Sequence, residues 1–288
     1  MKKLGFVLVI IFLGFNVVQG QELESYRIYD SKGKQVDFGS MNAGLEKADV
    51  ILFGEMHDNP IIHWLQLEMC KARIDGNELV LGAEWFESDN QVVMDEYLAG
   101  VITHDHLKKE AKVWPNYKTD YSPIIDFAKT NNLDFIATNI PRRYASLVSK
   151  QGPNALDSLG QDSKVLLPAL PYSVTKDDEG YERMRSMMGA HGHGMNIDYL
   201  IAAQALKDYT MAQNILSNRT KKQQFIHFNG TFHSQGHDGI ANYLMAADKK
   251  MKVSVIATVE ADALDWNEEW NGYGDFLIVT PASMTKTH

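Results

Sequence analysis

The stretch Asp49-Val-Ile-Leu-Phe-Gly-Glu-Met-His57 decides the fold of this chain, because it joins a buried strand to a polar turn. A nearly uninterrupted apolar run such as residues 49–54 is typical of a strand covered on both faces of a parallel sheet. The run ends at Gly54, where glycine permits a tight turn without a Cβ clash. Glu55 and His57 follow directly, so the stretch predicts a core strand that delivers polar side chains to a sheet edge.

The same pattern returns along the chain, and segments with helical spacing separate the apolar runs. Further strands are predicted over residues 78–84, 133–138, 223–228, 252–259 and 275–279, and helices over 59–74, 122–131, 196–217 and 239–247. Buried strands alternating with helices predict an α/β fold with a mainly parallel central sheet and flanking helices. The stretches 88–117 and 141–217 have helical patterns without a strand, and we expect the second to form a smaller helical subdomain.

The first twenty residues have the pattern of a secretory signal peptide. Lysines at positions 2 and 3 precede an apolar run over residues 4–15, and small residues precede Gln21. We therefore expect an exported protein, periplasmic or secreted, whose residues 21–288 form a single α/β domain with helical excursions. A lipoprotein signal needs a cysteine at the cleavage point, and the one cysteine of the sequence is Cys70. We therefore do not expect a lipoprotein.

The charge of the chain narrows the choice of partners. The formal net charge is −9 at pH 7, so nucleic acid is excluded as an expected partner. A small molecule, a metal ion or another protein all remain compatible with this balance.

Polar side chains follow most of the predicted strands. In an open parallel sheet, ligands bind beyond the carboxyl ends of the strands. Glu55 and His57 follow the first strand, Glu84 ends the second, Arg142 follows the third and His233 follows the fourth. We expect these side chains to meet at one rim of the sheet.

Two Gly-x-x-His units, at residues 54–57 and 230–233, are the sharpest local pattern. His57 and His233 together with Glu84 could bind a divalent metal. The same residues with Glu55 could instead supply a general base and an orienting acid, as a hydrolase requires. Hydrogen-bonded loop histidines without either role are the third interpretation, and the spacing does not choose among the three.

Other candidate ligands lie outside the predicted strand ends. His191 and His193 stand among methionines, which suits a soft metal or a porphyrin face but also a plain loop. Tyr117 and Tyr121 flank Lys118, and a tyrosine phenolate is an axial ligand for ferric haem in some proteins. On the helix 196–217, Gln204 and Asp208 share one face, which is either a solvated edge or the wall of a polar pocket.

Six segments occur in order between residues 49 and 245. They are Ile51-Leu-Phe-Gly-Glu-Met-His-Asp-Asn-Pro60, Gly82-Ala-Glu-Trp-Phe-Glu87, Trp114 with Tyr121 to Ala128, Asn139-Ile-Pro-Arg142, Ala203-Gln-Ala-Leu-Lys-Asp-Tyr-Thr-Met-Ala212, and Phe228-Asn-Gly-Thr-Phe-His233 with Gly239. Together they resemble the ChaN-like haem-binding uptake family. The skeleton also resembles the wider group that contains the TIKI and TraB proteins and the erythromycin esterases.

The resemblance implies a haem-binding protein in haem and iron uptake, in which two haems stack in a pocket formed by a homodimer. It implies an outer-membrane haem receptor as a partner, an axial tyrosine from one subunit, and a histidine and a lysine from the other subunit against the propionates. Tyr121 or Tyr117 is the first choice for the axial ligand, with Tyr144 and Tyr172 as alternatives. The other cofactor-binding candidates are Lys118, Arg142 and His191 or His193. The wider group implies the alternative, a metal-dependent hydrolase using Glu55, His57, Glu84 and His233.

Overall fold

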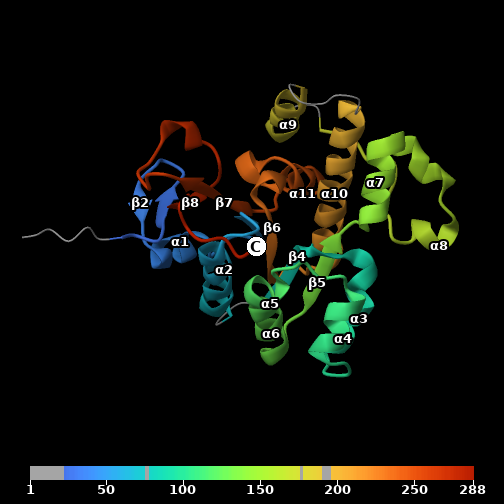
Figure 1. Ribbon diagram of the computed structural model, residues 1–288, viewed down its shortest axis with the longest axis horizontal. Helices are drawn as coiled ribbons and strands as arrows, with labels where there is room; N and C mark the ends of the chain where they lie inside the picture. The colour runs from blue at the N-terminus through green and yellow to red at the C-terminus, as the bar shows by residue number, and fades with distance from the viewer. Residues whose placement is uncertain (1–22, 75–77, 176–177, 190–195) are drawn as a thin grey trace, which may run out of the picture.

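The computed structural model describes residues 23–74, 78–175, 178–189 and 196–288 (Figure 1). In this part of the chain, eight strands form one sheet in the order β2-β1-β8-β7-β3-β6-β4-β5. The strands are β1 (Arg27–Asp30), β2 (Gln35–Val36), β3 (Val50–Glu55), β4 (Glu78–Glu87), β5 (Phe135–Asn139), β6 (Gln223–Gly230), β7 (Val253–Ala261) and β8 (Phe276–Pro281). From β3 to β8 all pairings are parallel, whereas β1 and β2 form an antiparallel edge. The predicted α/β fold with a mainly parallel sheet is confirmed.

Helices cover both faces of this sheet. They are α1 (Phe38–Gly44), α2 (Pro60–Arg73), α3 (Gln91–Leu98), α4 (His104–Glu110), α5 (Tyr117–Asp120), α6 (Ser122–Thr130), α7 (Arg142–Gln151), α8 (Gln161–Lys164), α9 (Glu179–Gly189), α10 (Ile197–Ser217) and α11 (Ile240–Ala247). Figure 1 shows α2, α5 and α6 on one side of the sheet and α10 and α11 on the other. None of the described helices combines the length and the apolar composition needed to span a bilayer.

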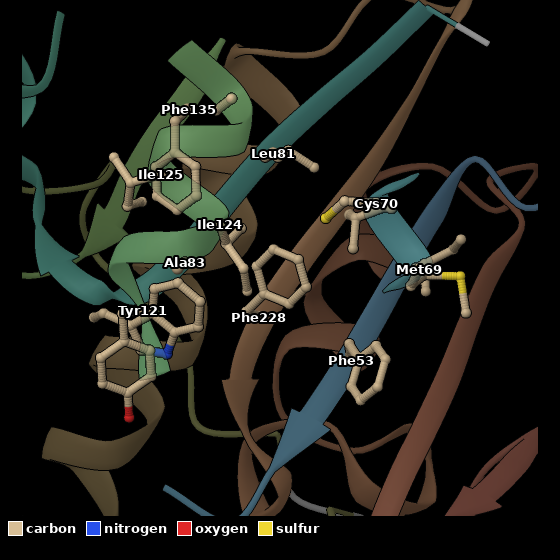
Figure 2. Packing of buried hydrophobic residues seen from close by; sticks show 14 of the residues in the cluster. Phe53, Met69, Cys70, Leu81, Ala83, Tyr121, Ile124, Ile125, Phe135 and Phe228 are labelled. Atoms are coloured by element: carbon tan, nitrogen blue, oxygen red, sulfur yellow. The ribbon is translucent and has the colours of Figure 1, made fainter. Parts of the chain in front are cut away.

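The alternation of side chains along β3 explains this two-sided cover. Successive residues of a strand point to opposite faces. Ile51 and Phe53 pack with residues of α2 and α6, whereas Val50 and Leu52 pack with residues of α10 and α11. Figure 2 shows the first of these cores, in which Phe53, Met69 and Cys70 lie beside Phe228 and Ile124. The strand is therefore apolar at every position because neither face meets water.

The two stretches expected to be helical contain only helices and connecting segments in their described residues. The first carries α3 and α4 and reaches the start of α5, and the second carries α7 to α10. A separate apolar cluster joins α7 to α10 through Tyr144, Val148 and Leu206. This cluster holds α10 against the end of β5, so that one long helix borders the carboxyl rim of the sheet.

Gly54 is required by a close approach between backbones. A Cβ atom built at this position would lie 2.9 Å from Cα of Thr231 and 3.1 Å from the carbonyl oxygen of Ile256. Backbone atoms cannot move aside as a side-chain end can. We therefore expect Gly54→Ala to lower the free energy of unfolding by about 1–3 kcal/mol, measured by urea denaturation. Gly160→Ala is the matched control, since no heavy atom lies within 4 Å of its Cβ, and a loss as large in the control would contradict the steric explanation.

Candidate functional site

A cavity of about 980 Å³ opens beyond the carboxyl ends of β3, β6, β4 and β5, which are neighbours in the sheet. Its walls come from these strand ends, from the segment 111–114, and from the helices α7, α9 and α10. His57, Glu84, Arg142 and His233 all line it. The rim predicted from the strand-end pattern and the cavity are therefore the same place.

Glu55 is the buried anchor beneath this cavity. Its side chain is fully buried at the end of β3, where it accepts hydrogen bonds from several donors. Gln66 Nε2 donates to one carboxylate oxygen at 2.7 Å, and Trp85 Nε1 donates to the other at 2.9 Å. The Tyr121 hydroxyl lies 3.3 Å from that second oxygen. Burial alone would raise the pKa of Glu55, but the neighbouring His63 and His57 lower it, so this carboxylate is charged at neutral pH.

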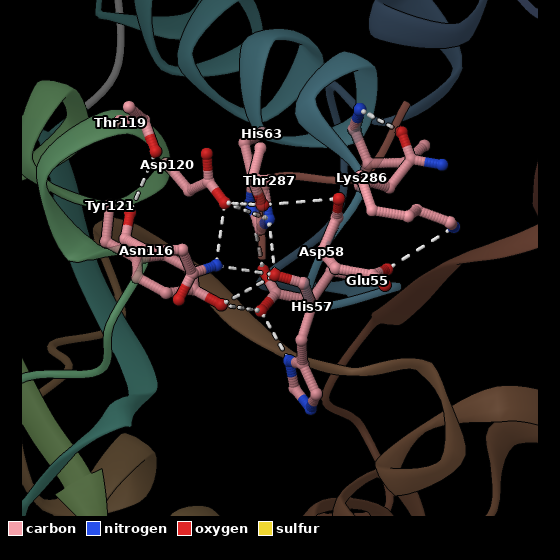
Figure 3. Close-up of polar contacts among 12 residues, drawn as sticks. Glu55, His57, Asp58, His63, Asn116, Thr119, Asp120, Tyr121, Lys286 and Thr287 are labelled. Carbon is pink, nitrogen blue, oxygen red and sulfur yellow. Dashed lines mark hydrogen bonds and ion pairs between the residues drawn. The ribbon is translucent and has the colours of Figure 1, made fainter. Parts of the chain in front are cut away.

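His57 stands on Glu55 and faces the cavity. Its Nδ1 lies 2.8 Å from a Glu55 oxygen, and its side chain is 41 % exposed. With Nδ1 bound to the carboxylate, Nε2 is the ring nitrogen turned toward the cavity. Figure 3 shows the imidazole pointing away from the polar groups that surround the backbone of His57. Burial works against the charged ring, but the hydrogen bond to Glu55 and the charges of Glu55 and Glu84 raise the pKa of His57 above its ordinary value.

Three donors converge on the backbone carbonyl of His57. Asn116 Nδ2 lies 2.7 Å from this oxygen, His63 Nε2 lies 3.1 Å from it, and the Tyr121 hydroxyl lies 3.2 Å from it (Figure 3). A hydrogen bond between Asn116 Nδ2 and Asp120, at 2.6 Å, orients the asparagine. A polar network of this kind rigidifies the turn that it surrounds. The turn after β3 therefore presents the His57 ring in one fixed orientation.

Glu84 lies where β4 loses its regular pairing with β5. The register between these strands shifts between Ala83 and Glu87, and such irregularities often re-aim side chains next to functional sites. The buried Glu84 carboxylate accepts the backbone N–H of Gly230 at 2.8 Å and lies 3.0 Å from His233 Nε2. Its position ties β4 to the turn after β6.

His233 is held between two carboxylates. Its Nδ1 bonds to Asp208 on α10, and its Nε2 bonds to Glu84 on β4. Burial alone would lower the pKa of His233, but the charges of Glu84 and Asp208 outweigh it and raise the pKa to about 10. His233 in turn holds the pKa of Glu84 well below its usual range. The cluster is therefore a buried carboxylate–imidazolium–carboxylate row that fastens α10 to the sheet.

The Glu84–His233–Asp208 row should make the free energy of unfolding decrease in alkaline solution. The pKa of His233 is about 10 in the folded chain against 6.5 for an unperturbed histidine, so its contribution is complete below pH 6.5 and is lost as the pH rises through about 10. We expect the urea midpoint to fall between pH 6.5 and pH 10. His233→Gln, which cannot take up the proton, should show a smaller fall over the same interval, and equal falls in both proteins would contradict the assignment.

The remaining walls combine cationic and apolar side chains. The cationic residues are Lys112, Arg142, Arg143, Arg183 and Lys207, whereas the acidic residues of the lining are Glu84 and Glu87. Within the described ranges, neither Lys112, Arg142 nor Lys207 has an ion-pair partner. The apolar lining includes Trp85, Trp114, Ile140, Met184, Met188 and Phe232. A chain with a net charge of −9 thus gathers cations around one cavity, which favours an anionic ligand with a large apolar face.

Several predicted cofactor-binding residues lie elsewhere. Tyr117 and Tyr121 are buried in the core, where burial raises the pKa of both hydroxyls, and Lys118 is exposed away from the cavity. An iron–tyrosinate bond from either tyrosine would require its side chain to leave this core position. His191 and His193 lie outside the described residues.

The divalent metal predicted for His57, Glu84 and His233 finds no support in the described residues, among which no three His, Cys, Asp or Glu side chains form a metal site. The geometry gives a reason, because both ring nitrogens of His233 already bond to carboxylates. An imidazolium has no lone pair for a metal.

Some residues of the site were not predicted. Lys207 lines the cavity three residues after Gln204 on α10, so the polar face of that helix could have revealed it. Of the two interpretations of that face, the polar pocket is the one observed, since Gln204 lines the cavity and Asp208 bonds to His233. Arg183 and Lys112 come from segments that carry no pattern of their own, and only the tertiary fold brings them to the rim.

Comparison with solved structures supports the fold. The structure described as cofacial haem binding to ChaN of Campylobacter jejuni matches with a TM-score of 0.68 and 19 % identity, covering 91 % of this chain and 99 % of that one. A protein from Bacillus cereus matches with a TM-score of 0.47 and 10 % identity over 77 % of this chain and 68 % of that one. An erythromycin esterase matches with a TM-score of 0.44 and 10 % identity over 82 % and 77 %. The last two likenesses are too weak to carry an argument.

Comparison at the level of sequence gives the family. No curated protein matches the chain significantly. The family model described as haem-binding uptake, Tiki superfamily, ChaN matches residues 41–244, which include every strand from β3 to β6 and most of α11. This match covers more than half of the chain and contains all the side chains that meet at the cavity. The chain belongs to the ChaN haem-binding uptake family of the Tiki superfamily.

Proposed function

We propose that the chain binds haem in the cavity beyond β3, β6, β4 and β5, and that it carries haem in iron uptake. The observation that carries this proposal is the composition of the cavity, which joins aromatic and methionine side chains to a surplus of cations. Haem has the matching chemistry, since its porphyrin face is apolar and its two propionates are anionic. The volume of about 980 Å³ also lies at the upper end of the range for cofactor pockets.

The cationic residues of the cavity divide into those that form an ion pair within the chain and those that do not. Arg143 pairs with Asp89 at 2.6 Å, and Arg183 pairs with Asp238 at 3.2 Å. Arg142 and Lys207, in contrast, make no ion pair with any residue in the described ranges and are free to meet a ligand. We assign the propionates to Arg142, at the start of α7, and to Lys207, in the middle of α10.

Titration of the purified protein with hemin tests the proposal. We expect a saturable Soret band, and weaker binding in Arg142→Ala and Lys207→Ala. Lys118→Ala is the matched control, because this lysine is exposed and does not line the cavity. Absence of a spectral change with hemin would overturn the proposal, and a loss confined to Lys118→Ala would move the propionate site to the residue predicted from the sequence.

Export through the signal pattern of residues 1–20, delivery to an outer-membrane haem receptor and assembly as a homodimer are parts of the same proposal. Two apolar side chains at the cavity support a covering partner, because Phe232 is 63 % exposed and Met187 is 62 % exposed. Sedimentation with and without hemin tests the dimer, and a monomer under both conditions would contradict it.

A hydrolase is the second candidate, and one observation favours it. His57 has a carboxylate behind Nδ1 and turns Nε2 toward a cavity, which is the arrangement of a general base that takes a proton from attacking water. Hydrolysis of a panel of esters and peptides by the purified protein, with His57→Ala as the control, tests this candidate. Equal rates in both proteins would argue against it.

A further inference from the structure

We infer that the segment after β8, residues 282–288, is a strap that fixes the turn carrying His57, with Thr287 as its positioning residue. This inference rests on the proposed haem-binding function, because His57 lines the cavity that is proposed for haem. The turn after β3 leads within a few residues into α2, so the path of its backbone sets the direction of the His57 ring. The strap makes its contacts on this turn and on the residues that hold it.

The strap crosses the carboxyl rim of the sheet to reach this turn. The strands β8, β7 and β3 are successive neighbours in the sheet. The backbone N–H of Ala282 donates to the carbonyl of Ala261 at the end of β7, at 2.9 Å, and a hydrogen bond from Met284 N–H to the Pro281 carbonyl closes the next turn. Thr287 then lies between the turn after β3 and helix α5 (Figure 3).

Thr287 holds the turn by two routes. Its backbone N–H donates to the carbonyl of Asp58, the residue after His57, at 3.1 Å. Its hydroxyl donates to Oδ2 of Asp120 on α5 at 2.6 Å. The same carboxylate oxygen accepts Nδ2 of Asn116, and this amide also donates to the carbonyl of His57. Thr287 therefore bonds to the turn directly and also orients, through Asp120, the amide that holds the His57 backbone.

Lys286 supports the same turn by charge. Its ammonium group lies 3.4 Å from a carboxylate oxygen of Asp58 and bonds to Glu260 near the carboxyl end of β7. Glu260 also accepts Nδ2 of Asn59 at 2.8 Å, and Asn59 caps the N-terminus of α2. Two carboxylates at this distance from one ammonium group would repel each other without it. The strap is therefore bonded to both residues that follow His57, to Asp58 directly and to Asn59 through Glu260.

The strap is docked by polar bonds and not by apolar packing. No residue of 282–288 belongs to the apolar clusters found in the described part of the chain. Lys286 and Thr287 are partly exposed, whereas Asp120, which accepts the Thr287 hydroxyl, is almost fully buried. Hydrogen bonds are directional, so they fix the orientation of the groups that they join. Such a segment suits the positioning of one turn better than the stabilisation of a core.

The experiment compares the wild type with Thr287→Val, Thr287→Ser and Thr285→Val. Thr287→Val keeps the shape of the side chain and removes its hydroxyl, whereas Thr287→Ser keeps the hydroxyl. Thr285→Val is the matched control, because Thr285 is exposed and lies two residues earlier in the same strap. A pH titration of the His57 ring signals by NMR measures the pKa of His57 without any ligand. Titration with hemin, followed at the Soret band, measures the affinity of the cavity.

Thr287→Val should lower the pKa of His57 toward its ordinary value. A looser turn lets the ring move away from Glu55, whose hydrogen bond and charge raise this pKa. We expect the same variant to bind hemin about 2- to 10-fold more weakly, which is the size of effect that one hydrogen bond has. Thr287→Ser and Thr285→Val should match the wild type in both measurements. A general loss of stability would not move the pKa of His57 in the folded protein.

The outcomes separate the strap from the proposed function. An unchanged pKa of His57 or an unchanged hemin affinity in Thr287→Val would overturn the inference while haem binding stands. Equal changes in Thr285→Val and Thr287→Val would overturn it as well, since the effect would then not depend on the bond to Asp120. If the wild type failed to bind hemin, the proposed function would fall, and the pKa comparison would still decide whether the strap positions His57.

Discussion

Replacing His233 with alanine is expected to lower the free energy of unfolding by about 3–5 kcal/mol, because it leaves two buried carboxylates without their shared partner. Glu84 and Asp208 are both almost fully buried, and each bonds to one nitrogen of the His233 ring. Without the imidazolium, the two acids face each other in a low-dielectric site, and at least one must take up a proton. Urea denaturation at pH 7, monitored by tryptophan fluorescence, measures the loss.

His237→Ala is the control for this prediction. His237 also pairs with a carboxylate, Asp275 at 3.1 Å, but both side chains are partly exposed, with 32 % and 42 % of their surface accessible. An exposed pair contributes at most about 1 kcal/mol. If the two variants lost similar amounts, the row of Glu84, His233 and Asp208 would not be the fastening of α10 that its geometry indicates.

The central strands of the sheet could be predicted from the sequence because they are buried on both faces. Continuous apolar runs predict β3, β6 and β7 to within two residues of their observed ends. A strand that is covered on both faces has no solvent-exposed side, so its sequence does not alternate between apolar and polar residues. The short antiparallel strands β1 and β2 were missed, and they lie at an edge where polar residues are tolerated. The extension of β4 through Glu87 was also missed, because a shift of register is a property of two paired strands and leaves no pattern in one.

Part of the candidate site could also be predicted from the sequence, because the strands of the sheet are parallel. Parallel strands bring the residues at their carboxyl ends to one rim, so Glu55, His57, Glu84 and His233 could be grouped without coordinates. The partners Gln66, Asn116 and Asp208 belong to helices and turns whose orientation toward the rim depends on packing. Tyr121 shows the limit most clearly. A tyrosine near a binding motif could be an iron ligand or a hydrogen-bond donor within the core. The sequence does not choose between these roles, whereas the burial of Tyr121 and its contact with Glu55 favour the second.

Glu55→Ala is the second variant with a large expected effect, a loss of more than about 3 kcal/mol in the free energy of unfolding. Gln66, Trp85 and His57 each donate to this carboxylate, and a buried donor left without an acceptor costs about 1–3 kcal/mol. The loss is measured by urea denaturation. Glu55→Gln keeps the volume and one acceptor oxygen, so it should lose less than Glu55→Ala. Similar losses in both would mean that charge, and not hydrogen bonding, is what the network requires.

Comparison of Glu55→Ala with His57→Ala separates the two halves of the Gly-Glu-x-His motif. Glu55 is fully buried beneath the cavity, whereas the His57 side chain is 41 % exposed and has one ring nitrogen without a hydrogen-bond partner among the described residues. We therefore expect His57→Ala to lower the free energy of unfolding by about 1–2 kcal/mol, less than Glu55→Ala, because it removes one of several donors to the buried carboxylate. His57 contributes less to the fold than Glu55 does, and the carboxylate fixes its ring toward the cavity, as a ligand-binding role requires. If His57→Ala proved as destabilising as Glu55→Ala, the histidine would be one more core donor, and its orientation toward the cavity would carry no functional meaning.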